Sequence, residues 1–340
     1  MTPQLSIIIP VCNTARYLPE CLDSCRAQTF ADWECLLVDD GSTDDSAAIC
    51  ESYVRSDARF RLFRNRHLGA AEARNAGLRA ARGEWIGFAD SDDRFRPEMF
   101  ARMIEAQRDS GADVVICSFR AFESPDRTVF YPDFHAATPA NRIFGTDDVG
   151  LLFLCDAGPW NKLFLRDFLK KNELRFPRGL RYEDIFFWNR LVRLRPSFYY
   201  LPEKFYEYRQ NRQGSTIASH TIDDLALSFR ATMKTVEALG RPELMRSFGA
   251  RFSLRAFKAA AQASGAQRKR FVRRCKALFR QVCRVTGKTG SIGLYLWVKC
   301  PARLLDSLIL LGLPLRFRSF AQTVKRCDSF FMQRRDTRHE

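Results

Sequence analysis

Short strand-like runs alternate with helical segments along the first 120 residues, and this alternation constrains the fold more than any other feature. The runs occupy residues 5–11, 33–39, 60–65, 84–90 and 113–119. The segments between them have the apolar spacing of helices. Strands that alternate with helices in this way predict a mostly parallel sheet covered by helices on both faces. The sequence therefore predicts an α/β protein.

Polar side chains follow three of the predicted strands. Asn13 comes after the first strand, Asp39 and Asp40 end the second, and Asp90 and Asp92 follow the fourth. Ligands of parallel sheets bind at the carboxyl ends of the strands, so we expect these side chains to line one crevice. The alternative for the stretch that begins at Asp40 is a turn that caps the next helix.

Asp90, Ser91 and Asp92 form a D-x-D motif. Side chains two residues apart in an extended segment point to the same side, so one carboxylate can bind a sugar hydroxyl while the other reaches a divalent ion beside it. Such an ion takes one or two protein carboxylates and completes its shell with phosphates and water, which fits a nucleotide diphosphate. An acidic turn before the helix that starts near Pro97 is the alternative.

Two further groups of candidates lie past residue 150. Glu183 and Asp184 open a predicted helix, where carboxylates either act chemically or interact favourably with the positive end of the helix dipole. Trp160 precedes Asn161 and Lys162 in a loop-like stretch. The alternatives are packing for Trp160 and a solvated surface position for Lys162.

Three later residues complete the candidates. Residues 197–210 are predicted to form a hairpin, at the end of which Arg209 and Ser215 could close over phosphate groups. His220 could ligate a metal or a phosphate, although a single histidine is more commonly an ordinary surface residue.

Four stretches resemble, in order, the motifs of glycosyltransferase family 2, the inverting transferases of GT-A fold. They are SIIIPVCN, LLVDDGSTDDS, RNRHLGAAEARNAGLRAARGEWIGFADSDD and PWNKLF…RYEDIFF. The resemblance covers roughly residues 4 to 215, and although each motif alone is weak, the ordered set is specific. It implies a GT-A domain whose Rossmann-like, mostly parallel sheet is flanked by helices.

The resemblance also implies roles for individual residues. The donor-binding residues would be Pro10, Val11, Asn13, Asp39, Arg74, Asn75, Asp90 and Ser91. Among these, Asp39 would bind uracil, and Asp90 the ribose or the sugar. Asp92 would ligate Mn²⁺ or Mg²⁺, and Asp184 would be the catalytic base. The acceptor side would be formed by Trp160, Asn161, Lys162 and Glu183.

The sequence departs from the family pattern at two places. Cys12 stands where the family often has an aromatic residue, which puts base stacking at this position in doubt. Arg66 and His67 stand where small or polar residues are usual, and they either reach a phosphate or lie on the surface.

The charge divides the chain into two regions. Residues 225–340 hold 25 Lys and Arg against 6 Asp and Glu, a net charge of +19, whereas the preceding residues have a net charge of −3. We expect a catalytic domain at 1–220, with a nucleotide-sugar-binding half at about 1–120 and an acceptor half at about 121–220. A basic helical region would follow at 221–340.

The basic region suggests an anionic partner. Basic helices with interspersed aromatic residues bind an anionic membrane face, where each Lys or Arg contributes about 1 kcal/mol. A lipid-linked acceptor would make such contact useful. Packing on the catalytic domain and a homodimer interface are the alternatives. No nucleic-acid partner is expected, because no motif of that kind is present.

The cysteines and the apolar runs predict the compartment. The eleven cysteines include no CxxC pair, and we interpret them as reduced thiols of a cytoplasmic protein. We expect no signal peptide, and the apolar run at 304–315 contains Asp306 and Pro314 and is shorter than a membrane span. The expected location is the cytoplasm, with peripheral contact to the inner face of the cell membrane as an extension.

These features together predict an inverting, metal-dependent glycosyltransferase of hexosyltransferase type. It would move a sugar from a nucleotide diphosphate donor, expected to be a UDP-sugar, to a hydroxyl of a glycan or glycolipid in surface polysaccharide synthesis. The alternative is a binding or scaffold protein at a membrane with a degenerate transferase domain. A dinucleotide-dependent oxidoreductase is disfavoured, because residues 7–17 lack the Gly-rich turn that such proteins need after the first strand.

Overall fold

The computed structural model describes residues 2–124, 127–129, 138–148, 156–210, 222–241 and 244. The described residues up to 210 belong to one compact unit, and those from 222 onward belong to a second. The second unit includes α8 (Ile222–Ala238), which falls in the helical region expected at 221–340, although most of that region lies outside the described residues. Within the described residues, no helix combines the length and the hydrophobicity that a membrane crossing requires.

The described part of the first unit contains a ten-stranded mixed sheet. The strand order is β3-β2-β1-β4-β9-β6-β10-β5, with β7 beside β6 and β8 beside β10. The four strands β1 to β4 are parallel, β9 is antiparallel to both β4 and β6, and β10 is parallel to β6. The strands are β1 (Leu5–Val11), β2 (Trp33–Asp39), β3 (Phe60–Arg64), β4 (Trp85–Phe88), β5 (Arg94–Phe95), β6 (Val114–Ser124), β7 (Arg127–Val129), β8 (Ile143–Phe144), β9 (Lys162–Leu165) and β10 (Phe198–Arg209).

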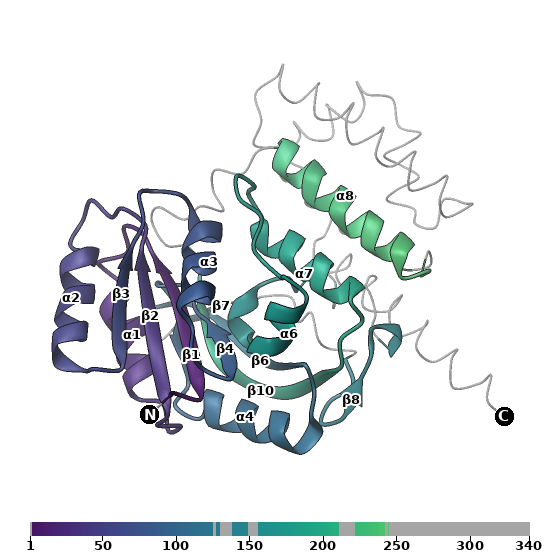
Figure 1. Ribbon diagram of the computed structural model, residues 1–340, viewed down its shortest axis with the longest axis horizontal. Helices are drawn as coiled ribbons and strands as arrows, with labels where there is room; N and C mark the ends of the chain where they lie inside the picture. The colour runs from purple at the N-terminus through teal and green to yellow at the C-terminus, as the bar shows by residue number, and fades with distance from the viewer. Residues whose placement is uncertain are drawn as a thin grey trace. The chain divides into compact units, whose positions relative to one another are not determined.

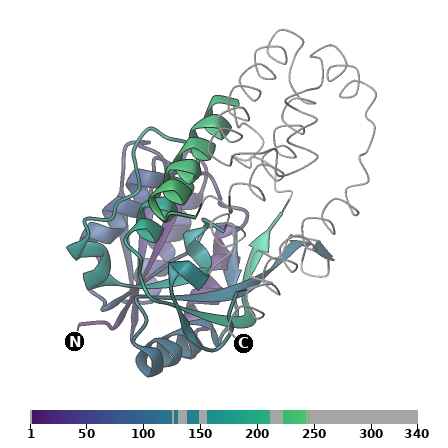
Figure 2. The ribbon, with the colours of Figure 1, turned by 90° about the vertical axis from the view of Figure 1, so that its right-hand side faces the viewer.

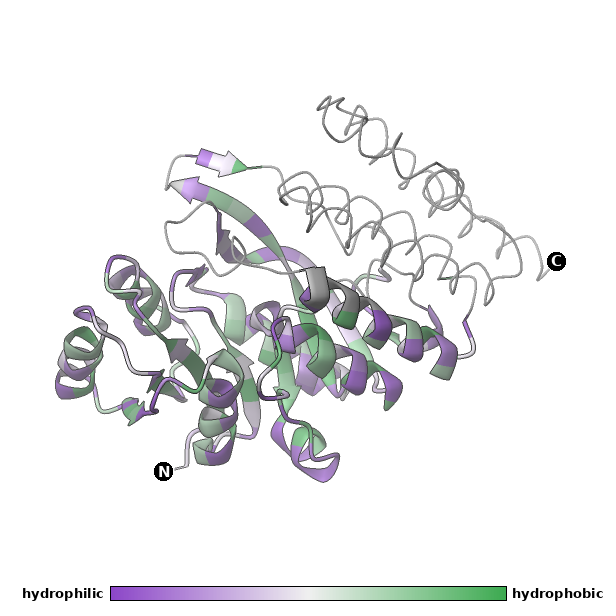
Figure 3. Cartoon of the chain, turned by 90° about the horizontal axis from the view of Figure 1, so that it is seen from above, coloured by the Kyte–Doolittle hydropathy of each residue, from purple (hydrophilic) through white to green (hydrophobic). Residues whose placement is uncertain are grey.

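Helices connect the strands as the alternating pattern predicted. Figure 3 shows helices that carry both hydrophilic and hydrophobic residues, as expected where one helix face packs on a sheet and the other meets solvent. Two 3-10 turns, at Thr146–Asp148 and Pro159–Asn161, precede later elements. The helices of this unit are α1 (Leu18–Arg26), α2 (Ser46–Ser56), α3 (Ala70–Ala80), α4 (Met99–Ser110), α6 (Arg166–Lys171) and α7 (Glu183–Arg193).

Helices cover both faces of the sheet. Ile7 and Ile9 of β1 belong to the same core cluster as Leu22 of α1. Ile8 points to the opposite face, where Gly77 of α3 packs so closely that a Cβ on it would lie 2.3 Å from Ile8 Cγ2. Helix α4 packs against β6 and β10 and lies below β10 in both ribbon views (Figures 1 and 2). The predicted α/β fold with helices on both faces is confirmed.

Phe198–Arg209 forms one strand, so the hairpin predicted at 197–210 is wrong. β10 runs alongside β6, and its register shifts between Leu201 and Lys204 and again before Tyr206. Pro202 lies in this irregularity, where a strand can lack a ladder N–H. A proline within an apolar run indicates a bulge as readily as a turn. Residues 120–150, predicted to be an irregular loop, include the end of β6 and the short strands β7 and β8.

Substitution of Gly77 by alanine tests the contact between α3 and β1. Alanine is normally the better residue in a helix by about 1 kcal/mol. Here the added Cβ would collide with Ile8, so we expect Gly77→Ala to lower the free energy of unfolding by about 1–3 kcal/mol. Chemical denaturation measures this. The double variant Ile8→Ala/Gly77→Ala should cost less than the sum of the single variants, and additive costs would contradict the contact.

Candidate active site

Three parallel strands end at one edge of the sheet. β1 lies between β2 and β4, and the register pairs Val11 with Asp39 and Ile8 with Phe88. The segments that follow these strands therefore lie side by side. Val11 is fully buried, whereas Pro10 is partly exposed, so of these two predicted donor contacts only Pro10 presents surface.

Side-chain hydrogen bonds join these segments. Asn13 has a left-handed φ of 51°, and its amide oxygen accepts a hydrogen bond from the Thr43 N–H at 2.8 Å. The Thr14 hydroxyl donates to the Ser91 hydroxyl at 3.0 Å, and both residues are buried. Asn13 and Ser91, both predicted to bind the donor, thus also hold the edge together.

The neighbouring carboxylates of Asp39 and Asp40 have different partners. Asp40 is buried, and its two oxygens accept hydrogen bonds from the backbone N–H groups of Leu68 at 2.8 Å and Gly69 at 2.7 Å. Asp40 therefore holds the loop that leads into α3. Asp39 accepts a longer bond, 3.3 Å, from the Ser42 N–H. Among the described residues, the Asp39 carboxylate therefore has fewer and longer hydrogen bonds than the Asp40 carboxylate. This leaves it acceptor capacity, which its predicted role in binding uracil requires.

The two departures from the family pattern lie at this same strand end. The Cys12 thiol lies 3.8 Å from the carbonyl oxygen of Asp40, and Nδ1 of His67 lies 3.2 Å from that oxygen. The sulfur of Cys12 and His67 Nδ1 are 4.0 Å apart. His67 is exposed but packs back on the end of β2, and Arg66 is exposed beside it.

Arg74 of α3 links the two acidic clusters that the sequence predicted. Its side chain is 7% exposed, and its two terminal nitrogens donate to Asp90 at 2.7 Å and to Glu183 at 2.6 Å. Burial lowers the pKa of Arg74, but the Asp90 and Glu183 carboxylates outweigh this effect and raise the pKa above its ordinary value. A permanent cation therefore brings together the end of β4 and the start of α7.

Asp184 lies beside this bridge in the first turn of α7. One of its oxygens accepts a hydrogen bond from the Ile185 N–H at 2.8 Å. Burial and the Glu183 carboxylate raise the pKa of Asp184 to about 6, although Arg74 opposes the rise. A carboxylate with this pKa is ionised at neutral pH and is a stronger base than an ordinary aspartate.

The carboxylates after β4 have separate environments. Asp92 is partly exposed, whereas Asp93 is 1% exposed and accepts hydrogen bonds from the Tyr206 hydroxyl and the Arg209 N–H, both at 2.7 Å. Burial, followed by the charges of Asp92 and Asp90, raises the pKa of Asp93 well above its ordinary value. Asp93 therefore attaches the acidic turn to β10, while Asp92 lies nearer the surface.

Arg209 contacts the protein beneath the acidic turn. Its Nε donates to the carbonyl oxygen of Asp92 at 2.8 Å, and a terminal nitrogen pairs with Glu20 of α1. Its guanidinium also lies over the rings of Tyr17 and Phe122. These contacts hold the backbone of the D-x-D motif, which is a different use of Arg209 from the predicted closure over phosphates.

The Trp160–Lys162 stretch is buried. Trp160 stacks on Tyr206 and Tyr208 with ring centroids 4.6 and 5.0 Å apart, so packing, the stated alternative, describes its contacts. Lys162 is fully buried, which overturns the solvated alternative. Burial lowers the pKa of Lys162, although the Asp156 carboxylate opposes the shift. Lys162 Nζ donates to Asp156, Gly158 and Asn161 at 3.1, 2.6 and 2.8 Å.

Asn75 also has protein partners, in the segment before α7. Its amide nitrogen donates to the carbonyl oxygen of Phe176 at 2.8 Å, and its amide oxygen accepts from the Phe176 N–H at 2.9 Å. Both polar ends of this predicted donor contact are therefore engaged with Phe176. Of the remaining candidates, Ser215 and His220 lie outside the described residues.

Sequence reasoning missed several residues that support the site. Asp93 had a local signal, because it follows the D-x-D motif directly. Asp156 lies only six residues before its partner Lys162, whereas the other three lie more than a hundred residues from the groups that they contact. The missed residues are Glu20, Asp93, Asp156, Phe176 and Tyr206.

The residues of this edge fit a divalent cation that is held jointly with a substrate. In the described ranges, no three His, Cys, Asp or Glu side chains are grouped so as to hold a metal ion by themselves. Asp92 lies nearer the surface than Asp93, which is committed to Tyr206 and Arg209. One or two carboxylates, with phosphate and water oxygens, are the usual environment of Mg²⁺.

Replacement of Lys162 tests whether the buried cluster stabilises the fold. Lys162→Met leaves the Asp156 carboxylate buried without its cation, so we expect the free energy of unfolding to fall by about 3–5 kcal/mol. Lys171→Met, at an exposed position in α6, is the control and should change it by less than about 0.5 kcal/mol. Equal stabilities of the two variants in urea would contradict a structural role for Lys162.

Comparison with known proteins places this arrangement in a family. The profile described as "Glycosyl transferase family 2" matches residues 6–172. The glycosyltransferase GlyG of Streptococcus pneumoniae is 30% identical over 227 residues, which are 63% of this chain and 73% of GlyG. EpsJ of Bacillus subtilis, an uncharacterized glycosyltransferase, is 34% identical over 221 residues. The match spans 64% of each chain, so this chain covers less than two thirds of EpsJ.

Solved structures have the same fold. S. aureus TarS 1–349 in complex with UDP-GlcNAc aligns with a TM-score of 0.69 and 20% identity, covering 95% of this chain and 92% of that chain. The mannosyltransferase PcManGT of Pyrobaculum calidifontis, in complex with GDP-Man and Mn²⁺, aligns with a TM-score of 0.55 and 16% identity, covering 96% and 85%. The expected GT-A fold is confirmed, and the chain belongs to glycosyltransferase family 2.

Proposed function

We propose that this protein is an inverting, metal-dependent glycosyltransferase of hexosyltransferase type. It transfers a sugar from a nucleotide diphosphate donor to a hydroxyl of a glycan or glycolipid acceptor in surface polysaccharide synthesis. The observation that carries the proposal is the Arg74 bridge between Asp90 and Glu183. This bridge brings a carboxylate at the donor edge of the sheet next to the pair that contains a candidate base.

Departure of the nucleotide diphosphate leaves negative charge on its β-phosphate. Asp92 would hold Mn²⁺ or Mg²⁺, and the bound cation supplies electrostatic stabilisation of that charge. Asp90 binds the ribose or sugar hydroxyls. Arg209 and Asp93 keep the backbone of the motif in place through the contacts to Asp92 and Tyr206.

The acceptor hydroxyl is a poor nucleophile, because it ionises only at high pH. Asp184 accepts its proton as the oxygen attacks the anomeric carbon. General-base assistance of this kind contributes about 10²–10⁴-fold to the rate. One base and one direct displacement invert the anomeric configuration. The raised pKa of Asp184, about 6, supports this assignment, since the group is still ionised at neutral pH.

The donor is proposed to be a UDP-sugar. Asp39 ends β2 with a carboxylate that can accept the N3–H of uracil, and the one bond that the structure gives it is long, at 3.3 Å. The UDP-GlcNAc complex of TarS supports this choice. PcManGT was solved with GDP-Man, so GDP-sugars are the alternative donors to test. A cytoplasmic location, with the basic region at 221–340 in contact with an anionic membrane, remains part of the proposal.

Thermal unfolding with a panel of UDP- and GDP-sugars tests the donor site. We expect a UDP-sugar to raise the melting temperature only when Mn²⁺ or Mg²⁺ is present, because ligand at 100 times its Kd adds about 2.7 kcal/mol to stability. Asp92→Asn should abolish the metal-dependent part. Asp109→Asn, at an exposed position in α4, is the control. Absence of stabilisation by every donor tested would leave the scaffold alternative.

Asp184→Asn tests the base. We expect turnover to be lost while donor affinity is kept, and the wild-type kcat/KM to fall as the pH drops below about 6, where Asp184 becomes protonated. Because ionisation of Asp184 opposes folding above this pKa, the variant should be more stable at pH 7.5 by about 1–2 kcal/mol. That gain should shrink towards pH 4.

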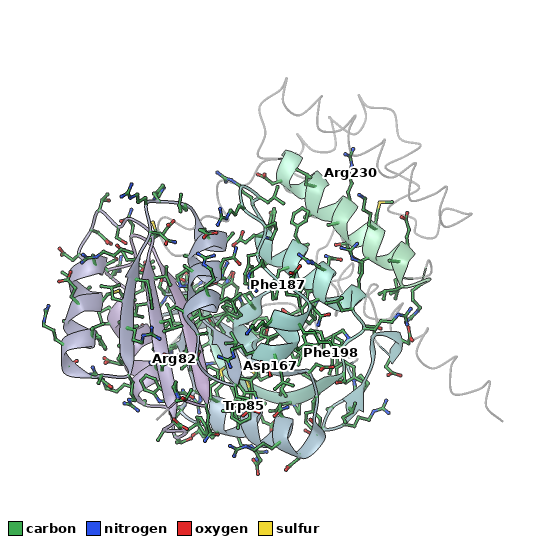
Figure 4. All side chains as sticks on the ribbon, viewed as in Figure 1. Arg82, Trp85, Asp167, Phe187, Phe198 and Arg230 are labelled. Carbon is green, nitrogen blue, oxygen red and sulfur yellow. The ribbon has the colours of Figure 1, made fainter. Side chains whose placement is uncertain are left out.

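Asp167→Asn is the matched control, because Asp167 lies exposed in the first turn of α6 (Figure 4). It should leave the pH profile and the turnover unchanged. Near-normal turnover of Asp184→Asn would remove Asp184 from the reaction.

A further inference from the structure

The segment that leads to Asp184 depends on side chains for its position. Residues 172–182 contain neither helix nor strand. Glu173, Gly179 and Tyr182 in this segment have positive φ angles of 49°, 70° and 61°. Only glycine adopts such angles without strain, and the segment has no ladder of backbone hydrogen bonds to fix it. Contacts with a regular element must therefore hold it in place.

Helix α3 supplies these contacts. Asn75 makes two hydrogen bonds to the backbone of Phe176, at 2.8 and 2.9 Å. Glu72 is buried and pairs with the exposed Arg178 at 2.6 Å. The Phe176 ring then stacks on Phe187 of α7, with centroids 4.2 Å apart and an interplanar angle of 8° (Figure 4 labels Phe187). One helix face thus fixes both the segment and the helix that follows it.

Arg74 completes the set and has a second attachment. It pairs with Glu183 at the start of α7, and also with Asp90 at the end of β4. Its guanidinium lies 5.4 Å from the centroid of the Phe176 ring, and its Nε is buried with no hydrogen-bond partner in the described part of the chain. Its two terminal nitrogens therefore bind one carboxylate on the proposed donor side, Asp90, and one next to the proposed base, Glu183.

We propose that Arg74 is a positioning residue, which holds Glu183, and with it the base Asp184, at a fixed place relative to the donor carboxylate Asp90. This inference rests on the proposed function. It differs from the role as a donor contact that the sequence resemblance implies. In a donor contact the guanidinium would lend its charge to the diphosphate, whereas here both terminal nitrogens are used between protein carboxylates.

The charges around Asp184 give Arg74 a measurable effect. Glu183 on the same helix and Asp90 after β4 oppose ionisation of Asp184, and Arg74 of α3 favours it. Lys162 of β9 is a further cation in the field of Asp184, but its ammonium is committed to Asp156. Removal of the Arg74 charge should therefore make Asp184 harder to ionise.

The test compares Arg74→Gln with Arg74→Lys. Arg74→Gln should raise the pH at which kcat/KM is half-maximal by about one unit and lower kcat at pH 7 at least tenfold. Calorimetric affinity for UDP with Mn²⁺ should change less than threefold. Arg74→Lys keeps the charge but cannot span two carboxylates, so it should hold the pH profile within about 0.3 units while kcat still falls.

Arg55→Gln is the control, because Arg55 of α2 is 70% exposed and, within the described residues, pairs only with Glu51 of its own helix. It should leave both kcat and the pH profile unchanged. If Arg74→Gln does not fold, the kcat of Arg74→Lys decides whether the bridge matters. A large loss of UDP affinity with an unmoved pH profile, or wild-type kcat in Arg74→Lys, would overturn the inference.

A measurement without turnover separates this inference from the proposed function. Carboxyl ¹³C NMR follows the titration of Asp184, whose signal is the one absent from Asp184→Asn. Arg74→Gln should move that titration upward even if no donor is ever turned over. Failure of every donor would then refute the function alone, whereas an unmoved Asp184 titration in an active enzyme would refute the positioning role alone.

Discussion

Negative charges that lie together at one edge of a sheet must be compensated. In this protein the position of the candidate site depends on the cation that compensates them. In a partly desolvated site, carboxylates a few ångströms apart oppose one another's ionisation. Arg74 neutralises part of this charge by bridging Asp90 and Glu183. Burial, and after it the neighbouring carboxylates, raise the pKa values of Asp93 and Asp184, so part of the repulsion remains. In the proposed reaction, a divalent cation and the diphosphate of the donor would complete the neutralisation.

The parallel part of the fold could be predicted from the sequence, because its pattern is local. Apolar runs such as 5–11 and 33–39 are short and separated by a segment of helical spacing, and they form β1 and β2. The second part of the sheet could not be predicted in the same way. β9 pairs antiparallel between β4 and β6, and β10 runs through Pro202 as one bulged strand. These pairings join distant segments, and nothing in a local pattern specifies them.

The candidate site, like the fold, could be predicted only where its features are local in the sequence. The D-x-D motif and the Glu183–Asp184 pair were recognisable as candidates because they occur in the order of the motifs of the family that the sequence resembles. Their partners were not recognisable. Asn75 reads as part of a motif, but its amide is engaged with Phe176 about a hundred residues away. Lys162 was expected on the acceptor side, with a solvated surface position as the alternative, and it is fully buried against Asp156. Burial and long-range pairing decide such roles, and a single sequence contains neither.

The adjacent aspartates at the end of β2 make different contacts. Asp40 anchors the loop before α3 through Leu68 and Gly69, while its neighbour Asp39 is left with one long bond. Successive side chains of an extended segment face opposite sides. A one-residue insertion anywhere in β2 would therefore reverse the sides that the two carboxylates face. Asp40 would then turn away from the N–H groups of Leu68 and Gly69 and towards the proposed donor site. Insertions in this strand should be far less tolerated than substitutions, and a library of length variants would find the 33–40 segment almost fixed in length.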